Sequence, residues 1–387
     1  MQLGGVPLDS AHEWRQSWAR AYRRCKVPLV SSPLDLEGDV VQLLRALIDV
    51  ESVSGNETKI ADLVEQALQQ YDHLNVLRDG NVVFARTELD RSERVVIAGH
   101  LDTVPVAGNL PSWTSQDSHG REIIWGRGAC DMKGGIAVQL SAAAALVRPR
   151  RDITWVFYDN EEVEEYRNGL SRIARAHPQY LEGTFAVLCE PTSARIEGGC
   201  QGSMSLVVVL TGIAAHSARA WMGHNAIHDA GPVLQRLSSH QAQQIEVDGL
   251  IYREGLNAVA INGGIAGNVI PDRCLIEINY RFAPDKSPAE AEAYVRKVLD
   301  GYSIRVLDVA AGARPGLEQP AAAEFLRAVG GEATAKLGWT DVARFSAMGI
   351  PAVNFGPGDP TKAHADDEFC PAGDVVACRE ALIRWLS

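Results

Sequence analysis

Two residues with metal-binding side chains stand at the end of a short apolar run. The β-branched run at residues 95–97 is broken by Gly99, which predicts a buried strand that ends beside His100 and Asp102. Because these two residues are two positions apart, an extended backbone points their side chains to one side. The spacing suits a metal-binding imidazole whose second ring nitrogen is held by the Asp102 carboxylate. Alone, the pair is more typical of ordinary polar loop residues.

Five potential metal ligands share one kind of position, just beyond an apolar run or at a glycine-rich turn. They are His100, Asp131, Glu162, Glu190 and His364. Open α/β sheets place their functional sites at the carboxyl ends of strands, where such residues would meet. Two imidazoles and three carboxylates suit two zinc ions, each with one histidine and one terminal carboxylate, which share a bridging carboxylate.

Glu161 directly precedes one of these ligands. On a tight turn neighbouring side chains diverge, so Glu162 could bind a metal ion while Glu161 faces the reacting water. A metal ion lowers the pKa of such a water, and a nearby carboxylate can accept its proton. We therefore predict that Glu161 is the general base and returns the proton to the leaving amine. The alternative is a solvated acidic turn, because Glu164 and Glu165 continue the charge.

An ordered set of short motifs resembles the M20 family of metallopeptidases. The motifs are Gly-His-Leu-Asp at 99–102, Gly-Ala-Cys-Asp-Met-Lys-Gly-Gly at 128–135, Tyr-Asp-Asn-Glu-Glu at 158–162, Cys-Glu-Pro at 189–191, Ala-His-Ser-Ala-Arg at 215–219, Gly-Asn-Val-Ile-Pro at 267–271 and Ala-His at 363–364. In this order they extend from the first third of the chain nearly to its end, which makes the set far more specific than any one pair.

The resemblance implies a distribution of the ligands over two zinc ions, for which cobalt could substitute. Asp131 would bridge the ions, with His100 and Glu190 on one of them and Glu162 and His364 on the other. Family members also have a cis peptide bond at the bridging aspartate, so we expect one after Asp131. The implied fold is α/β, a zinc-exopeptidase-like catalytic domain in which a mixed sheet is flanked by helices.

Three further residues are expected to meet the substrate. His216 matches a histidine that in this family comes from the partner subunit and stabilises the tetrahedral oxyanion, although a surface histidine is the alternative reading. Arg281 would bind a substrate carboxylate through its guanidinium fork, or would be an exposed charge at a strand end. Asn268 matches a position near the substrate backbone. A histidine supplied by a partner implies a homodimer.

The candidate ligands predict the type of reaction more closely than they predict the substrate. The ligand set does not choose between N-succinyl-diaminopimelate, N-acetylornithine, another N-acyl amino acid and a dipeptide. Residues 158–169 and 215–228 resemble the actinobacterial branch of the family that removes succinate from N-succinyl-LL-2,6-diaminopimelate, which favours that substrate. A metal-binding scaffold without catalysis is the alternative from another class, and Glu161 argues against it.

One departure from the family concerns the cations that meet the substrate. Residues 200–202, Cys-Gln-Gly, stand where proteobacterial desuccinylating members carry arginines that contact a substrate carboxylate. Arg219 or Arg344 could take over this contact. Arg344 is equally consistent with a charge on a helix surface.

Periodic apolar patterns predict the elements that position these residues. Residues 36–202 should form the first part of the catalytic domain, with helices at 40–48, 57–71 and 168–176 and a hairpin at 75–84. Strands at 204–210, 257–262, 273–282 and 304–309, with helices at 225–237 and 288–299, follow the β-α-β-β-α-β order of a ferredoxin-like unit. We therefore predict an inserted lid and dimerisation domain at 203–314.

The catalytic domain should resume at 315–387, with helices at 320–329, 342–348 and 377–386. Residues 1–35 are predicted to be an N-terminal extension, either disordered or a short helix.

Composition limits the classes of partner. The 387 residues carry a net charge of −12 with a pI near 5.4, which argues against nucleic acid or anionic membranes as partners. Seven cysteines occur without a Cys-x-x-Cys pair, which fits a reducing compartment better than a disulfide framework. No apolar run reaches 18 residues. We expect a cytoplasmic enzyme that acts on a small molecule.

Overall fold

The structure is a computed structural model that describes residues 34–387. The prediction for residues 1–35 therefore falls outside the described residues, apart from its last two positions. Pro33–Ser387 form one compact unit. In this described part of the chain, no helix is long and apolar enough to cross a membrane. The predicted cytoplasmic location stays a prediction.

An eight-stranded mixed sheet forms the centre of the part that is predicted to be catalytic. Its strands, in spatial order, are β1 (Asn75–Asp79), β2 (Val82–Arg86), β6 (Asp152–Tyr158), β3 (Arg94–His100), β7 (Phe185–Leu188), β18 (Ala352–Asn354), β8 (Glu197–Gly198) and β17 (Thr334–Ala335). The four central strands β6, β3, β7 and β18 are parallel neighbours. Their carboxyl ends therefore lie at one edge of the sheet, where the sequence places most of the candidate ligands.

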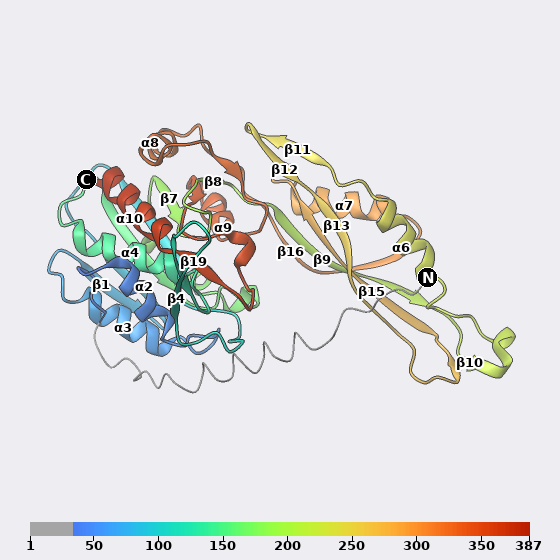
Figure 1. Ribbon diagram of the computed structural model, residues 1–387. Helices are drawn as coiled ribbons and strands as arrows, with labels where there is room; N and C mark the ends of the chain where they lie inside the picture. Colours follow the sequence, from blue (N-terminus) through green and yellow to red (C-terminus); the bar gives the residue numbers. More distant parts are fainter. Residues whose placement is uncertain (1–33) are drawn as a thin grey trace. The chain divides into compact units, whose positions relative to one another are not determined.

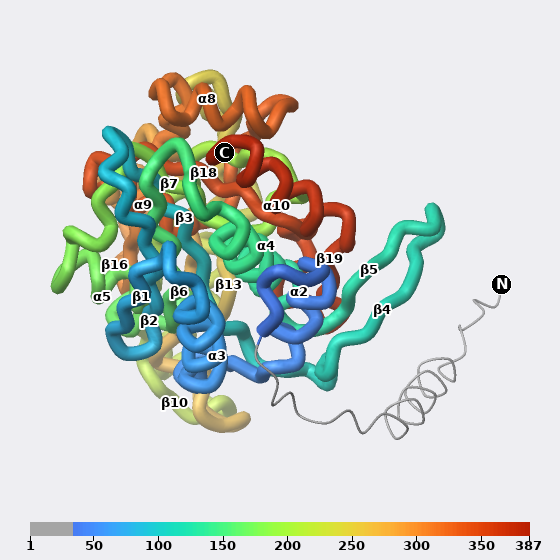
Figure 2. Tube along the Cα trace, turned by 90° about the vertical axis from the view of Figure 1, so that its left-hand side faces the viewer, coloured from blue at the N-terminus to red at the C-terminus, as the bar shows by residue number. Residues whose placement is uncertain are grey.

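Helices cover both faces of this sheet (Figure 2). The first face packs against α2 (Val40–Ile48), α3 (Thr58–Leu68), α4 (Lys133–Ala145), α8 (Pro320–Val329) and α10 (Ala372–Leu386), and the second against α5 (Gly169–Ala176) and α9 (Val342–Ala347). Alternate residues of β3 serve the two cores, because Val95 and Ile97 belong to the first and Val96 and Ala98 to the second.

A second sheet of four antiparallel strands follows in the chain. Its spatial order is β13 (Gly255–Gly263), β15 (Arg273–Phe282), β9 (Gly202–Thr211) and β16 (Ser303–Ala310). One face is covered by α6 (Ala230–Ser239) and α7 (Pro288–Val298) (Figure 1). Every second residue of β15 is buried against these helices. This arrangement is the predicted ferredoxin-like unit, whereas its predicted limits at 203 and 314 remain predictions.

Three small sheets are absent from the sequence-based prediction. They pair β4 (Trp113–Gln116) with β5 (Glu122–Trp125) and β19 (Phe369–Pro371), β10 (Ala215–His216) with β14 (Val269–Ile270), and β11 (Gln244–Val247) with β12 (Leu250–Arg253). Predicted helix limits also shift by several residues: α6 begins at Ala230 instead of 225, and α10 begins at Ala372 instead of 377.

Candidate active site

The five candidate ligands converge at the carboxyl edge of the large sheet. The Nε2 atom of His100 lies 3.1 Å from Oδ1 of Asp131, which precedes α4. The Nε2 atom of His364 lies 2.9 Å from a carboxylate oxygen of Glu162 and 3.4 Å from Oδ2 of Asp131. The two histidines thus approach the two oxygens of one carboxylate, although they are far apart in the sequence.

The donor atoms form overlapping groups of the size that a metal ion needs. Within each group the ligand atoms lie within 4.8 Å of one another. The groups are His100 with Asp131 and Glu190, Asp131 with Glu162 and His364, and His100 with Glu161 and Glu162. Asp131 belongs to the first two groups, which matches a pair of ions that share one bridging carboxylate.

Two glycines allow two segments of the chain to approach the backbone of Cys189, the residue before Glu190. A Cβ atom on Gly135, in the first turn of α4, would lie 2.2 Å from the carbonyl oxygen of Cys189. A Cβ atom on Gly356 would lie 2.4 Å from the same oxygen. Because no side chain fits at either position, the α4 start and the loop after β18 can both reach the end of β7. The expected cis peptide bond between Asp131 and Met132 is present.

Asp102 connects His100 with the turn that carries the two glutamates. The Nδ1 atom of His100 is 3.0 Å from the main-chain carbonyl oxygen of Asp102 and 3.5 Å from its carboxylate. The Asp102 carboxylate accepts hydrogen bonds from the backbone N–H groups of Glu161 and Glu162, at 3.0 and 3.1 Å, and from the Ser54 hydroxyl. With Nδ1 held in this way, Nε2 of His100 faces the ligand cluster.

The electrostatics of the cluster fit bound divalent cations. Burial, reinforced by the Asp131 charge, raises the pKa of Glu190 to about 7. Burial also raises the pKa of Glu161 well above its usual range, although the charge of His100 opposes it. Hydrogen bonds to Asp131 and Glu162 raise the pKa of His364 to about 10. The negative charges of these neighbouring carboxylates repel one another, and two divalent cations would neutralise them.

One oxygen of Glu190 supports the same conclusion. Its Oε1 atom is buried and has no hydrogen-bond partner among residues 34–387. A buried carboxylate oxygen without a donor is costly, so a ligand is expected there.

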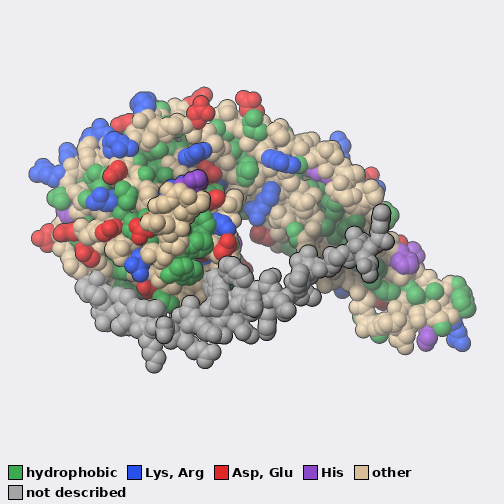
Figure 3. Space-filling model, viewed as in Figure 1, with side chains coloured by type: hydrophobic (Ala, Val, Ile, Leu, Met, Phe, Trp, Pro, Cys, Tyr) green, Lys and Arg blue, Asp and Glu red, His purple; other side chains and the backbone are tan. Residues whose placement is uncertain are grey.

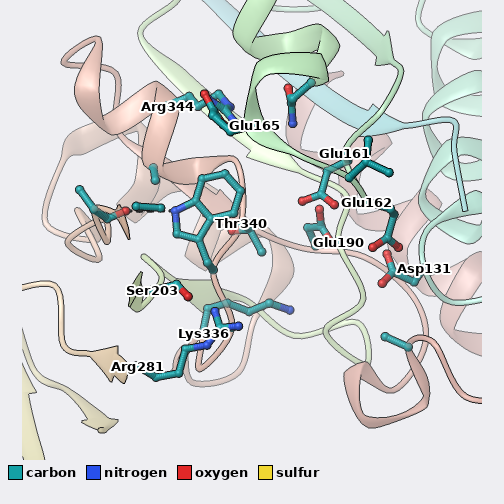
Figure 4. A pocket seen from close by; sticks show the side chains of 18 of the residues that line it. Asp131, Glu161, Glu162, Glu165, Glu190, Ser203, Arg281, Lys336, Thr340 and Arg344 are labelled. Atoms are coloured by element: carbon teal, nitrogen blue, oxygen red, sulfur yellow. Dashed lines mark hydrogen bonds and ion pairs between the residues drawn. The ribbon is translucent and has the colours of Figure 1, made fainter. Parts of the chain in front are cut away.

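Four of the five candidate ligands, all except His100, line one wall of a cavity of about 710 Å³. Figure 4 shows Asp131, Glu162 and Glu190 turned toward one another on one side of this cavity. Arg281 of β15 and Lys336, which follows β17, line the cavity away from that wall (Figure 4). The cavity therefore has an anionic wall that could bind metal ions and a separate region that could bind substrate carboxylates.

Arg344 also lines the cavity, but carboxylates already surround it. Its guanidinium is bonded to Asp341, which is fully buried, and to Glu165. Burial lowers the pKa of Arg344, but the hydrogen bonds and charges of Glu165 and Asp341 outweigh burial and raise this pKa. By contrast, Arg219 is exposed and does not line the cavity. The structure thus accounts for Arg344 without a substrate, and its predicted contact with the substrate remains a prediction.

His216 and Asn268 lie outside this cavity. The backbone N–H of Ser217 donates to the carbonyl oxygen of Asn268 at 2.9 Å, beside the short β10–β14 ladder. The His216 side chain is exposed and accepts a hydrogen bond from the backbone N–H of Ala218. Neither residue therefore reaches the ligand cluster of its own chain, and their predicted roles remain predictions.

Two residues of the site are missing from the sequence-based prediction. Lys336 is buried, and its Nζ atom lies 3.0 Å from the carbonyl oxygen of Pro191 and 3.0 Å from Glu197. Glu368 is buried under the segment that contains Asp131. Neither residue carries a local signal in the sequence, because its partners lie far away along the chain.

Comparison with known proteins agrees with this geometry. The sequence model of peptidase family M20/M25/M40 matches residues 96–387. The chain belongs to this family. The family membership and the relatives described next confirm the predicted enzyme class, a metal-dependent hydrolase.

Two relatives are similar over nearly their whole length. A Mycobacterium tuberculosis protein that carries the provisional name succinyl-diaminopimelate desuccinylase is 53% identical over 356 residues, which cover 91% of this chain and 99% of the relative. Succinyl-diaminopimelate desuccinylase of Corynebacterium glutamicum is 44% identical over 365 residues, which cover 92% of this chain and 98% of the relative.

Solved structures of M20-like proteins share the fold. A tripeptidase of Staphylococcus aureus has a TM-score of 0.74 at 19% identity and covers 92% of this chain, with 98% of its own chain aligned. A Bacillus subtilis protein described as a dinuclear metal-binding peptidase of the M20 family has a TM-score of 0.66 at 15% identity, with coverage of 90% and 97%. The predicted fold class is confirmed.

Proposed function

We propose that the protein removes the succinyl group from N-succinyl-LL-2,6-diaminopimelate and releases LL-diaminopimelate and succinate, a step toward lysine and cell-wall precursors. The observation that carries this proposal is its identity of 53% and 44% with relatives that bear a desuccinylase name, in each case over more than nine-tenths of this chain. The candidate ligands and the cationic region of the cavity support the same assignment.

The proposed cofactors are two zinc ions, for which cobalt could substitute. His100 and Glu190 would hold one ion, Glu162 and His364 the other, and Asp131 would contact both. When bound, the ions would polarise the scissile carbonyl group and lower the pKa of the attacking water. The mixed set of imidazole and carboxylate donors suits zinc.

Glu161 is the proposed general base. Its neighbour Glu162 is bonded to His364, whereas no side chain among the described residues donates a hydrogen bond to the carboxylate of Glu161. Asp102 holds the backbone of both glutamates, so the position of the Glu161 side chain is restrained. Glu161 would accept a proton from the attacking water and then donate it to the leaving nitrogen.

Arg281 is the proposed anchor for a substrate carboxylate. N-succinyl-diaminopimelate has three carboxylates and one ammonium group, so it needs cationic partners away from the metal ligands. Within residues 34–387, no carboxylate lies at ion-pair distance from Arg281, and its Nε donates at 3.2 Å to the Asn279 side chain. Burial lowers the pKa of Arg281. A half-buried guanidinium without a carboxylate partner favours an anionic ligand.

Lys336 would assist Arg281. Two acceptors, the Pro191 carbonyl and Glu197, lie near its ammonium group, which leaves a third hydrogen for the cavity.

The active enzyme is proposed to be a homodimer that uses His216 in trans. His216 is exposed and lies outside the cavity of its own chain, so a second copy is needed to bring this histidine to a substrate. Exposed hydrophobic side chains occur near His216, including Ile213, Trp221 and Met222. Hydrophobic side chains (green) and histidines (purple) are visible on the surface around β10 (Figure 3). Such a surface suits contact with another protein chain.

A panel of substrates tests the proposed function. With zinc present, we expect kcat/KM to be highest for N-succinyl-diaminopimelate, by about 10-fold or more over N-acetylornithine and a dipeptide, because a charge-assisted hydrogen bond contributes about 1.5–3 kcal/mol. The Glu161→Gln variant should lose about 10²- to 10⁴-fold in kcat with unchanged metal content. Equal or higher kcat/KM for another substrate would contradict the proposed substrate.

A further inference from the structure

The buried carboxylate of Glu368 is saturated with hydrogen bonds. Its side chain is 1% exposed. Oε2 accepts from Nη1 of Arg127 at 2.9 Å and from the backbone N–H of Gly128 at 3.0 Å. Oε1 accepts from the backbone N–H groups of Cys130 and Asp131, both at 3.1 Å. Because an ionised carboxylate has about four acceptor sites, these four donors leave Glu368 no capacity to act as a metal ligand itself.

These bonds join the two segments that supply the ligands Asp131 and His364. Glu368 follows His364 by four positions, and its bonds hold the backbone at residues 128–131. Nη1 of Arg127 also donates to the carbonyl oxygen of Ala365 at 3.1 Å. The short pairing of β19 with β5 continues the contact on the far side of Glu368. One carboxylate and one guanidinium therefore tie the two segments together.

The backbone at His364 needs such a restraint. Its φ angle is +65°, a left-handed conformation that side chains other than glycine rarely adopt. This conformation is strained, so it persists only where surrounding contacts enforce it. The residues that follow are restrained by several hydrogen bonds: from the backbone N–H of Ala365 to Lys362, from the Asn109 side chain to the carbonyl of Asp366, and those of Arg127 and Glu368.

We propose that Glu368 is a positioning residue of the dinuclear site, which fixes the distance between the Asp131 and His364 side chains and thereby sets the affinity for the metal ions. Arg127 compensates the charge of Glu368, so the contribution of Glu368 is geometric. This inference rests on the metal site of the proposed function, but it does not depend on which substrate is cleaved.

The test measures metal binding by the full-length protein. Metal-depleted wild-type protein and the Glu368→Gln variant are titrated with Zn²⁺ by calorimetry, and with Co²⁺ by absorption spectroscopy. The glutamine keeps the shape of the side chain but turns an amide N–H₂ toward N–H donors. We expect metal affinity to fall by about 10- to 100-fold, which is the usual effect of losing a residue that orients a ligand. At saturating zinc, kcat should largely recover.

Asp152→Asn is the matched control. Asp152 is also a buried carboxylate, 4% exposed, and it accepts hydrogen bonds from the Thr87 hydroxyl and the backbone N–H groups of Leu89 and Arg91. It stands at the start of β6, whereas Glu161 and Glu162 follow the end of that strand. We expect this variant to lower the melting temperature and to leave metal affinity unchanged.

The outcomes separate positioning from simple stabilisation. Weaker metal binding by Glu368→Gln, with unchanged binding by Asp152→Asn, supports the inference. Unchanged metal affinity of a folded Glu368→Gln variant, or an equal loss in both variants, overturns it. If Glu368→Gln does not fold, Arg127→Lys replaces it, and wild-type affinity in that variant also counts against the inference. Tight zinc binding by a wild-type protein that does not cleave N-succinyl-diaminopimelate would contradict only the proposed function.

Discussion

Single residues in the cavity differ in how their charge is already compensated. Arg344 is paired with two carboxylates, whereas Arg281 has an amide oxygen as its side-chain partner. A substrate carboxylate that approached Arg344 would have to displace existing partners. At Arg281 it would supply a counter-charge that the described residues do not provide. We therefore expect the substrate carboxylate to be recognised at Arg281.

Replacement of Arg281 should weaken substrate binding. We expect Arg281→Met to raise KM for N-succinyl-diaminopimelate by about 10- to 100-fold, because a charge-assisted bond of about 1.5–3 kcal/mol is lost. Steady-state kinetics at saturating zinc measures this effect. Arg219→Met is the control, since Arg219 is an exposed arginine outside the cavity. A similar KM for wild type and Arg281→Met would exclude this residue as the anchor.

The ligands were predictable at the residue scale, but their supporting residues were not. His100 ends a strand that the apolar pattern predicts, and Glu162 and Glu190 follow two others, so their positions in the sequence indicated their role. Lys336 acts through the carbonyl of Pro191, which is 145 positions away, and Glu368 through the backbone of Asp131, which is 237 positions away. Such contacts depend on the tertiary structure and leave no local pattern in the sequence.

At the scale of elements, β6 connects a structural carboxylate with the catalytic turn. Asp152, the first residue of β6, accepts a hydrogen bond from the backbone N–H of Leu89. Glu161 lies on the turn beyond the last residue of the same strand. Burial raises the pKa of Asp152, but the hydrogen bonds to its carboxylate outweigh burial and hold this pKa below its usual value. A carboxylate with a lowered pKa in the folded state stabilises the protein above its unfolded pKa.

The stability that Asp152 provides should depend on pH. At pH 7 we expect Asp152→Asn to lower the free energy of unfolding by about 1–3 kcal/mol. The difference should begin to shrink as the pH falls below the unfolded pKa of about 4, and should disappear once the pH is below the lower pKa of Asp152 in the folded state. Urea unfolding at several pH values measures the difference. Glu332→Gln, at an exposed carboxylate, should show no such trend. A difference that is independent of pH would refute the electrostatic explanation.

Element length explains which parts of the fold were predictable. The longer strands and the helices around both large sheets carry enough apolar residues to display their periodicity, as in β15, where alternate residues are buried. The ladders β10–β14 and β5–β19 contain two or three paired residues, too few to form a period. Yet these short ladders hold His216 beside Asn268 and bring Glu368 toward Asp131, so part of the site depended on elements that the sequence did not reveal.

At the scale of the whole molecule, one chain does not complete the proposed active site. Glu161 and four of the five candidate ligands line the cavity, whereas His216 lies on the exposed β10–η3 (Ser217–Met222) segment. A homodimer in which each inserted domain serves the partner would resolve this separation. A stable contact of this kind buries roughly 1,200 Å² or more. The exposed Trp221, at 80% of its surface, is a suitable part of such a contact.

Mixing two inactive variants tests this exchange. His216→Ala lacks the histidine but keeps Glu161, and Glu161→Gln has the reverse defect. If each site combines Glu161 of one chain with His216 of the partner subunit, a hybrid dimer contains one intact site and one doubly defective site. Random exchange makes about half of the dimers hybrid, so activity should rise to about a quarter of the wild-type value. Differently tagged chains verify that exchange has occurred. If activity then stays at the level of the separate variants, His216 does not act in trans, because a site built within one chain gains nothing from mixing.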